Sequence, residues 1–350
     1  MAAFFSINDT QNMGLALKLA RQGIHGVGAN PMVGCVIEKN GKIIAQGYHQ
    51  TYGEAHAEIN ALNQIGHQAH DATLYVTLEP CSHQGKTPPC AQAIIDSGAA
   101  NVIIATPDPN PLVAGQGMAI LEAAGINVKI GLLKEQAINL NRGFIKRMKT
   151  KHPFVTCKIA MSLDGKTSMS SGESKWITGE SARKDVQNLR ASYQAIMTGS
   201  GTVITDNPSM TLRQQNVDFS PLRVVIDGKN KITDSALNIF SSDAPTQVFN
   251  TNNTQTDDNG KLDLTNVLQQ LGDQGINSIL LEAGPGLIGA MIKNQLIDEF
   301  IIYTAPILMG SSANSMMQLP IEHMNEKTEL NISDLRMVGN DIRITATIKS

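Results

Sequence analysis

Residues 79–90 read EPCSHQGKTPPC, and a second polar segment, GEAHAE, precedes them at residues 53–58. Among their side chains, His56 offers an imidazole, and Cys81 and Cys90 offer two thiols. Three protein ligands of these types are typical of catalytic zinc sites, in which a fourth position stays open for water. The sequence therefore predicts zinc bound by these three residues.

Glu58 follows His56 by two positions. Residues two apart on a helix point in nearly opposite directions, so both can serve one site only if the metal lies over the helix N-terminus. Cys90 is also expected at a helix start, where the helix dipole favours a thiolate. The pattern is that of zinc deaminases, in which zinc-activated water attacks an amino-bearing ring carbon while a glutamate moves protons. We expect Glu58 to be this proton shuttle.

One departure from the deaminase pattern is the spacing of the cysteines. Eight residues separate Cys81 from Cys90, where the usual signature has two. His83 lies in this loop and leaves two readings open: as a fourth ligand it would make the zinc structural, and otherwise it would contact substrate, which we favour. The remaining cysteines, Cys35 and Cys157, lie in apolar runs and are expected to be buried strand residues.

The composition indicates a cytoplasmic enzyme of two domains. The chain has 350 residues, more than one core usually organises, and carries four Cys and a net charge of −3. No apolar run approaches bilayer length, the N-terminus lacks a secretory pattern, and no basic stripe suggests nucleic-acid binding. We place the boundary in the basic segment 141–152, which gives domains 1–149 and 150–350, and we expect a homo-oligomer that binds neither membrane nor nucleic acid.

Hydrophobic periodicity and turn signals predict alternating helices and strands, hence an α/β fold with a three-layer first domain. Asn40-Gly41 predicts a hairpin, and Gly23 is expected to end the first helix in a left-handed cap. Segment 241–260, rich in Ser, Thr, Asn and Asp, is expected to be an exposed, mobile connection. The expected helices are 9–21, 55–65, 89–96, 116–124, 179–192 and 287–294, and the expected strands are 32–38, 42–46, 73–78, 101–105, 154–160, 195–197, 223–226, 278–282 and 299–303.

Several motifs of the first half occur in the order of a known family. They are Asn30-Pro31-x-Val33-Gly34, Gly47-Tyr48-His49, His56-Ala57-Glu58, the segment 79–90 with its long spacer, and Asp108-Pro109-Asn110-Pro111. This half resembles the deaminase part of the bifunctional riboflavin-biosynthesis deaminase/reductase family, with a cytidine-deaminase-like fold. The resemblance implies a diaminopyrimidinone substrate carrying a ribosylamino 5′-phosphate. The residues it implies for the substrate pocket are Asn30, His49, His83, Lys86, Asp108 and Asn110.

The second half resembles the reductase of the same family, which has a dihydrofolate-reductase-like fold and uses NADPH. The motifs are residues 158–166 (KIAMSLDGK), 172–178 (GESKWIT), 199–203 (GSGTV), 206–208 (DNP) and 282–285 (EAGP). The turn 282–286 also leads from a predicted strand into a helix, a geometry suited to binding phosphate, although such a turn is more often only a tight connection. A Rossmann fold is not expected, because no G-x-G-x-x-G fingerprint is present.

The resemblance also implies the site residues of the second half. Lys158 would steer the open-chain imine or donate a proton to it, with Asp206 sharing the role. Arg190 and Arg213 would clamp the substrate phosphate, a task suited to guanidinium groups. Substrate would contact Ser174, Arg190, Arg213 and Glu282, and NADPH would contact Ala160, Trp176, Thr202, Asp206, Gly284, Pro285, Gly286, Leu287, Ile288, Gly289 and Ala290.

Two other functions are compatible with parts of this pattern. One is a tRNA deaminase with an unrelated tail, against which the acidic charge balance counts. The other is a structural zinc module in which His83 closes the coordination sphere. A bifunctional deaminase and reductase accounts for nearly the whole chain, and it is the function we expect.

Overall fold

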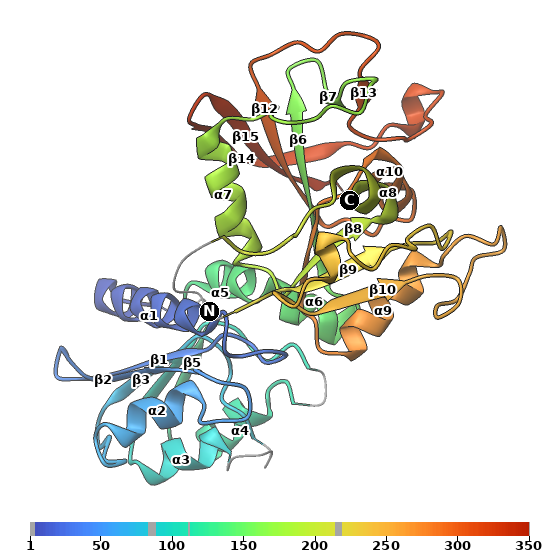
Figure 1. Cartoon of the computed structure of the whole chain (residues 1–350). Helices are drawn as coiled ribbons and strands as arrows, with labels where there is room; N and C mark the ends of the chain where they lie inside the picture. Colours follow the sequence, from blue (N-terminus) through green and yellow to red (C-terminus); the bar gives the residue numbers. More distant parts are fainter. Residues whose placement is uncertain (1–3, 83–88, 111–112, 214–218, 350) are drawn as a thin grey trace. The chain divides into compact units, whose positions relative to one another are not determined.

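The computed structural model describes residues 4–82, 89–110, 113–213 and 219–349. The chain divides into two compact units, Met1–Lys151 and His152–Ser350 (Figure 1). Within the described residues, no helix combines the length and the apolar character needed to cross a bilayer. Each unit has a sheet and a core of its own.

The first unit is built on a five-stranded sheet in the order β2-β1-β3-β4-β5. β1 pairs antiparallel with β2 and β3, and β3, β4 and β5 run parallel. Asn40 and Gly41, both with positive φ, form the predicted two-residue turn between β1 and β2. The strands are β1 (Gly34–Lys39), β2 (Lys42–Tyr48), β3 (Thr73–Val76), β4 (Asn101–Ile104) and β5 (Asn127–Ile130).

Alternating side chains on the central strands make this unit the predicted three-layer sandwich. Leu74 and Val76 of β3 face one layer of helices, while Tyr75 between them faces the other. The first layer contains α2 (Ala57–Asn63), α3 (Cys90–Asp96) and α4 (Gln116–Ala123), and the second contains α1 (Ile7–Ala20) and α5 (Lys134–Leu140). The carboxyl ends of β3 and β4 lead into the segments that carry Cys81 and Asp108.

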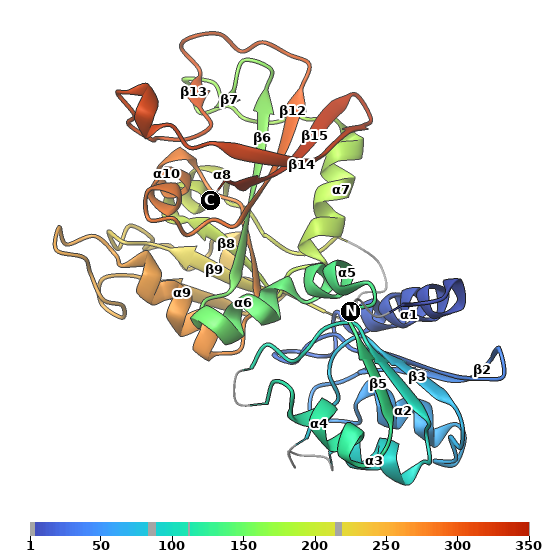
Figure 2. The same cartoon turned by 180° about the vertical axis from the view of Figure 1, so that it is seen from behind.

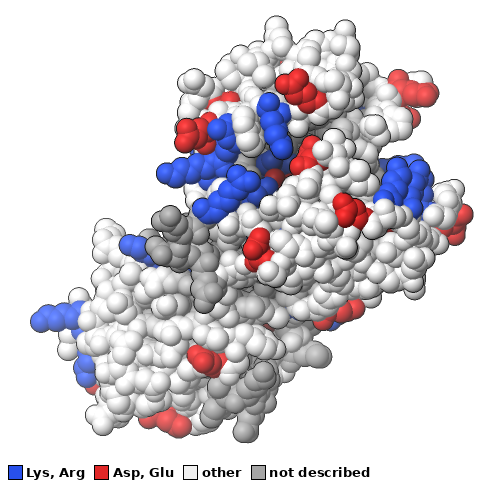
Figure 3. Space-filling view, in the orientation of Figure 1, with Lys and Arg blue, Asp and Glu red and all other residues white. Residues whose placement is uncertain are grey.

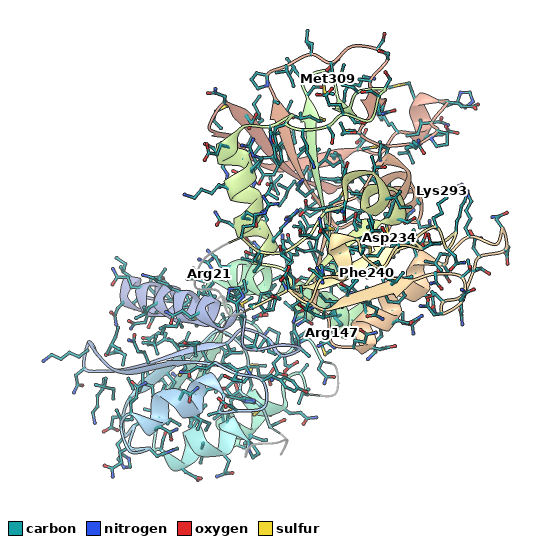
Figure 4. All side chains as sticks on the ribbon, viewed as in Figure 1. Arg21, Arg147, Asp234, Phe240, Lys293 and Met309 are labelled. Atoms are coloured by element: carbon teal, nitrogen blue, oxygen red, sulfur yellow. The ribbon has the colours of Figure 1, made fainter. Side chains whose placement is uncertain are left out.

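One expectation for this unit is wrong, and one of its helices is not predicted by the sequence. Gly23 does not adopt a left-handed conformation, because the chain continues past α1 as a short 3-10 turn, Arg21–Gly23. The basic segment near the boundary, for which no helix is predicted, forms α6 (Arg142–Thr150). The sequence hid this helix because few apolar residues mark it: it is held by Asn141, whose side chain bonds to Met32 N and O at 2.8 Å each, and by Arg147 (labelled in Figure 4), whose Nη2 donates to Ala29 O at 2.7 Å.

The second unit is built on an eight-stranded sheet in the order β10-β9-β8-β11-β6-β12-β15-β14. Its first six strands run parallel, β15 pairs antiparallel with β12, and β14 pairs antiparallel with β15. A separate two-stranded sheet joins β7 to β13. The strands are β6 (Phe154–Ser162), β7 (Lys166–Ser168), β8 (Ala195–Gly199), β9 (Leu222–Ile226), β10 (Thr246–Phe249), β11 (Ser278–Leu281), β12 (Glu299–Ala305), β13 (Asn314–Ser315), β14 (Leu330–Val338) and β15 (Asp341–Ile348).

Helices cover both faces of this sheet. The main core lies between one face and the apolar sides of α9 (Leu264–Asp273) and α10 (Pro285–Lys293). On the other face, α7 (Glu180–Arg190) packs against Ile301 and Tyr303 of β12, and α8 (Ser200–Asp206) packs against Ile196 and Val225. Figure 2 shows this unit from behind, with β14 on the near side. The arrangement is the predicted dihydrofolate-reductase-like fold.

The polar segment 241–260 is not only an exposed connection, as the composition suggested. It contains β10, which pairs in parallel with β9 and buries Phe249. A short strand at a sheet edge needs few apolar residues, so the composition of the longer segment obscures it. The helix α8 and the strands β14 and β15 were also not expected from the sequence.

Candidate functional site

The ring nitrogen of His56 and the sulfurs of Cys81 and Cys90 lie within 4.8 Å of one another. His56 Nδ1 is 3.2 Å from Cys90 Sγ and 3.6 Å from Cys81 Sγ. Tetrahedral zinc with ordinary bond lengths places an imidazole nitrogen and a thiolate sulfur about 3.6 Å apart. The donor set and its spacing therefore fit a zinc ion, with Nδ1 as the histidine donor.

Local structure places the three donors without distorting the backbone. His56 is the N-cap of α2 and has extended φ and ψ, so its side chain lies at the helix end rather than along its flank. Cys90 is the first residue of α3, and its N–H donates to Cys81 Sγ at 3.2 Å. The positive ends of two short helices thus face the same cluster, which favours thiolate ligands.

The electrostatics of the cluster already favour one thiolate. The hydrogen bond from Cys90, together with His56, lowers the pKa of Cys81 to about 4. The bond to Cys81 and burial raise the pKa of the Cys90 thiol well above its usual value. His56 gains a raised pKa from its bond to Cys81. The two thiol groups of Cys81 and Cys90 therefore hold one proton between them, and zinc binding must displace this proton.

Glu58 lies in the first turn of α2 and is 3% exposed. Burial and the neighbouring Cys81 raise the pKa of its carboxyl to about 7. Cys81, His56 and Cys90 all influence this pKa, so the carboxyl lies beside the donor cluster. A buried carboxyl whose pKa is close to neutral can both take up and release a proton at physiological pH.

Two of the expected pocket residues lie next to the cluster. The ring of His49 packs edge-on against that of His56, with centroids 5.3 Å apart. Its Nδ1 lies 3.1 Å from Ala55 O and its Nε2 lies 3.1 Å from Asn30 Nδ2, so Nδ1–H donates and Nε2 accepts. Burial lowers the pKa of His49, which keeps the ring neutral. His49 is only 2% exposed and thus orients Asn30, whereas Asn30 itself is partly accessible.

Asp108 and Asn110 follow β4 and are partly exposed. Asn110 N–H donates to Asp108 Oδ1 at 2.8 Å, which closes a turn between them. His83 and Lys86 lie outside the described residues, so their roles remain predictions from the sequence.

A second polar cluster lies in the other unit. Glu282 Oε2 is 3.2 Å from Lys158 Nζ, and Glu282 Oε1 accepts from Arg190 Nε at 2.6 Å. β6 and β11 are parallel neighbours that pair Cys157 with Leu281, so Lys158 and Glu282, one position further, extend side by side. Arg190 reaches Glu282 from the last turn of α7. The three side chains are each at most 16% exposed.

The segment that carries Arg213 lies along α7. Arg190 Nη1 donates to Thr211 O at 3.4 Å, and Arg213 N–H donates to Gln187 Oε1 at 3.1 Å. Arg213 is exposed and Ser174 is partly exposed. Figure 3 shows Lys and Arg side chains gathered over the region where Figure 1 draws α7. This positive surface suits a phosphorylated ligand.

Two of the segments expected to contact the dinucleotide, α8 and the start of α10, approach each other at Thr202 and Gly284. A Cβ on Gly284, the N-cap of α10, would lie 3.6 Å from Thr202 Oγ1 of α8. Asp206 ends α8 and is partly exposed, as is Ala160 on β6. Pro285 and Gly286 begin α10, whereas Leu287 and Ala290 pack against the core, Ile288 is buried in it, and Gly289 lies against Gln318 O.

Trp176, another residue expected to contact NADPH, is 65% exposed and packs against Arg183. The guanidinium of Arg183 lies 4.7 Å from the centroid of its ring. A large exposed aromatic face held by a cation–π contact is available to stack on a planar ligand.

Glu282 makes the stability of the second unit depend on pH. Burial alone would raise the pKa of Glu282, but attraction to Arg190 and Lys158 outweighs it and lowers the pKa to about 2. A depressed pKa stabilises the folded state above the ordinary value near 4.5, and this stabilisation, roughly 3 kcal/mol, is lost as pH falls toward 2. We expect Glu282→Gln to unfold at a lower temperature than the unmodified protein at pH 7, and the gap to narrow below pH 4.5. A constant gap from pH 7 to pH 3 would contradict this ion cluster.

Comparison with known proteins assigns both units. Residues 6–106 match the sequence profile of the cytidine and deoxycytidylate deaminase zinc-binding region, and residues 153–344 match that of the RibD C-terminal domain. The riboflavin biosynthesis protein RibD of Escherichia coli (strain K12) is 44% identical over 361 residues, which cover 96% of this chain and 98% of that protein.

Solved structures agree over nearly the whole chain. Acinetobacter baumannii RibD (form 1) is similar with a TM-score of 0.90 at 41% identity, covering 98% of this chain and 99% of that one. A Thermotoga maritima protein named as a diaminohydroxyphosphoribosylaminopyrimidine deaminase/5-amino-6-(5-phosphoribosylamino)uracil reductase is similar with a TM-score of 0.89 at 31% identity, with the same coverage.

The fold and its two clusters therefore define a bifunctional enzyme, a zinc-dependent deaminase joined to an NADPH-dependent reductase. The second unit is a reductase domain rather than an unrelated tail, so the tRNA deaminase alternative is not supported. The chain belongs to the RibD family of riboflavin biosynthesis.

Proposed function

We propose that the first unit deaminates a diaminohydroxyphosphoribosylaminopyrimidine and that the second unit then reduces 5-amino-6-(5-phosphoribosylamino)uracil with NADPH. The relative from Thermotoga maritima is named for this pair of reactions. The observation that carries the proposal is one chain holding both a His-Cys-Cys donor cluster beside a buried Glu58 and a Lys158–Glu282–Arg190 cluster.

In the deaminase, His56, Cys81 and Cys90 would hold zinc, whose Lewis acidity makes hydroxide available near neutral pH. Glu58 takes up the proton lost by the attacking water. The same carboxyl passes this proton to the ring nitrogen, then takes the proton of the newly added hydroxyl group and passes it to the amino group, which leaves as ammonia while a carbonyl forms in its place. Asn30, Asp108 and Asn110 line the pyrimidine pocket, and His49 fixes the amide of Asn30.

In the reductase, bound NADPH would be the hydride donor for reduction of the open-chain imine at its ribosyl carbon. Lys158 steers the imine or gives it the proton that completes its reduction to the ribitylamino product, with Asp206 as the other candidate. Glu282 holds Lys158 and Arg190 at fixed positions. This location beside both residues supports a contact between Glu282 and the sugar chain of the substrate. Arg190 and Arg213 receive the phosphate.

The cofactor contacts of the reductase are proposed for residues of α8, α10 and β6 and for Trp176. Thr202 and Asp206 from α8 and the turn 284–286 supply polar groups and the first backbone N–H groups of α10, a setting suited to phosphate. Residues 287–290 follow in the same helix and are also proposed to contact the cofactor, although Ile288 belongs to the core and its N–H donates to Gly284 O. Ala160 and Trp176 complete the proposed cofactor contacts, whereas Ser174 is proposed to contact the substrate.

For the chain as a whole we propose a homo-oligomer in the cytoplasm. The free thiols Cys35, Cys81, Cys90 and Cys157 support a reducing compartment. The apolar side chains Leu330, Ile332, Leu335 and Met337 on β14 support oligomer formation, because they share one face and are 42–63% exposed. β14 ends the sheet order, so the same strand of a second copy has an edge to pair with. A solution mass of a single chain would contradict the oligomer.

The substrate assignment is tested by product masses. The purified protein is incubated with the diaminopyrimidine phosphate, with and without NADPH. Without NADPH we expect ammonia and a product in which oxygen replaces one amino group; with NADPH, the product also gains two hydrogens. Absence of ammonia from zinc-loaded protein would contradict the assignment.

A further inference from the structure

Glu79 is a buried carboxylate with four backbone partners. The side chain is 5% exposed. Its Oε2 accepts the N–H groups of Asp108 at 3.1 Å and Gly115 at 3.0 Å, and its Oε1 accepts those of Gly117 at 3.0 Å and Met118 at 3.3 Å. All four bonds run to the segment that follows β4, more than 25 residues away in sequence.

Three of these bonds cap α4 from outside the helix. Gly115 is the N-cap of α4 and offers no side-chain oxygen, and Gly117 and Met118 lie in its first turn. The N–H groups of a first turn have no partner within the helix, and negative charge is favoured there. Glu79 supplies both the acceptor and the charge.

The same residue is bound to the segment that carries a zinc donor. Its N–H donates to Thr106 O at 3.0 Å, and Pro80 and Cys81 follow directly. α4 lies against this segment, because a Cβ on Gly117 would come within 2.0 Å of Pro80 O. Glu79 therefore joins the donor segment to the start of α4.

The fourth bond reaches the proposed pyrimidine pocket. Asp108 N–H donates to Glu79, and Asp108 Oδ1 accepts from Asn110 N–H. Fixing the backbone of Asp108 thus also fixes the turn that presents Asn110. The carboxylate of Glu79 therefore fixes the position of Asp108 and Asn110 relative to Cys81.

We propose that Glu79 is a positioning residue for pyrimidine binding, one that places Asp108 and Asn110 relative to the zinc donors without touching substrate or metal. This inference rests on the proposed deaminase function. Glu79 holds the pocket wall and is itself neither the proton carrier nor a zinc donor, so its loss should mainly raise KM. Zinc content and the reductase rate are unaffected.

Glu79→Gln is the most direct test. The amide keeps the shape of the side chain but has one acceptor oxygen in place of two, so two of the buried N–H groups lose their partner. We expect the KM for deamination to rise about tenfold or more, and kcat to change by less than about threefold. One zinc per chain and the NADPH oxidation rate should be retained. Steady-state kinetics and metal analysis on the full chain give all four quantities.

Matched variants separate positioning from general damage. Glu122→Gln makes the same chemical change at an exposed site in the last turn of α4 and should match the unmodified protein. Glu79→Asp keeps both oxygens on a shorter side chain, so its KM should lie between that of the unmodified protein and that of Glu79→Gln. Gly117→Ala forces α4 away from Pro80 by a different route, and it provides the same test if Glu79→Gln is insoluble.

An unchanged KM in soluble Glu79→Gln would overturn the inference, as would a loss of zinc in proportion to the loss of activity. If the unmodified enzyme releases no ammonia from the diaminopyrimidine, the proposed function fails instead, so the two failures are distinguishable.

Discussion

Glu58→Gln is expected to lower kcat for deamination by about 10²- to 10⁴-fold, the usual range for losing a general acid and base. The amide fills the same buried space but cannot carry a proton from water to the ring. None of the three donors is altered, so the variant should still bind one zinc per chain. Ammonia release and metal content are the measurements.

The reductase serves as an internal control for this variant. NADPH oxidation with the aminouracil substrate should be unchanged, because Glu58 belongs to the first unit. Glu54→Gln makes the same change at an exposed position four residues earlier and should retain full deaminase activity. Deamination by Glu58→Gln at the normal rate would rule out Glu58 as the proton carrier.

Lys158→Ala is expected to have the largest effect on the other reaction, slowing NADPH oxidation by about 10²-fold or more. The change removes the ammonium group proposed to steer or protonate the imine. Folding should survive, because Glu282 keeps its closer partner Arg190 at 2.6 Å. Stopped-flow absorbance of NADPH measures the rate.

Deamination by Lys158→Ala should match that of the unmodified protein. Lys293→Ala, an exposed lysine at the end of α10, is the matched control for removing a lysine from the second unit. A fall in both activities without unfolding would contradict separate active sites.

The zinc donors could be predicted because their chemistry is local in sequence. A His-x-Glu followed by Pro-Cys and a second Cys is rarely found outside zinc sites of this kind. The Asn-Gly pair likewise predicts a two-residue hairpin turn from two adjacent residues alone. The structure brings the three donors together as the pattern predicts. Leu74, Tyr75 and Val76 point alternately to the two faces of the sheet. That both faces are buried becomes clear only from the helices that pack on each side.

Other features could not be predicted because long-range partners determine them. α8 reads SGTVITD, in which the β-branched residues disfavour a helix, and packing of Val203 overrides that preference. The pairing of Lys158 with Glu282 depends on β6 and β11 being parallel neighbours. Glu79 stands in a recognisable motif, yet the four N–H groups that reveal its task lie in a distant segment.

The most direct test of two sites acting in sequence gives Glu58→Gln each substrate in turn, in the presence of NADPH, and measures the product masses. The diaminopyrimidine should remain unchanged, since reduction follows deamination, whereas the aminouracil should gain two hydrogens at the normal rate. A product of the diaminopyrimidine that is reduced but not deaminated, or failure to reduce the aminouracil, would contradict the account.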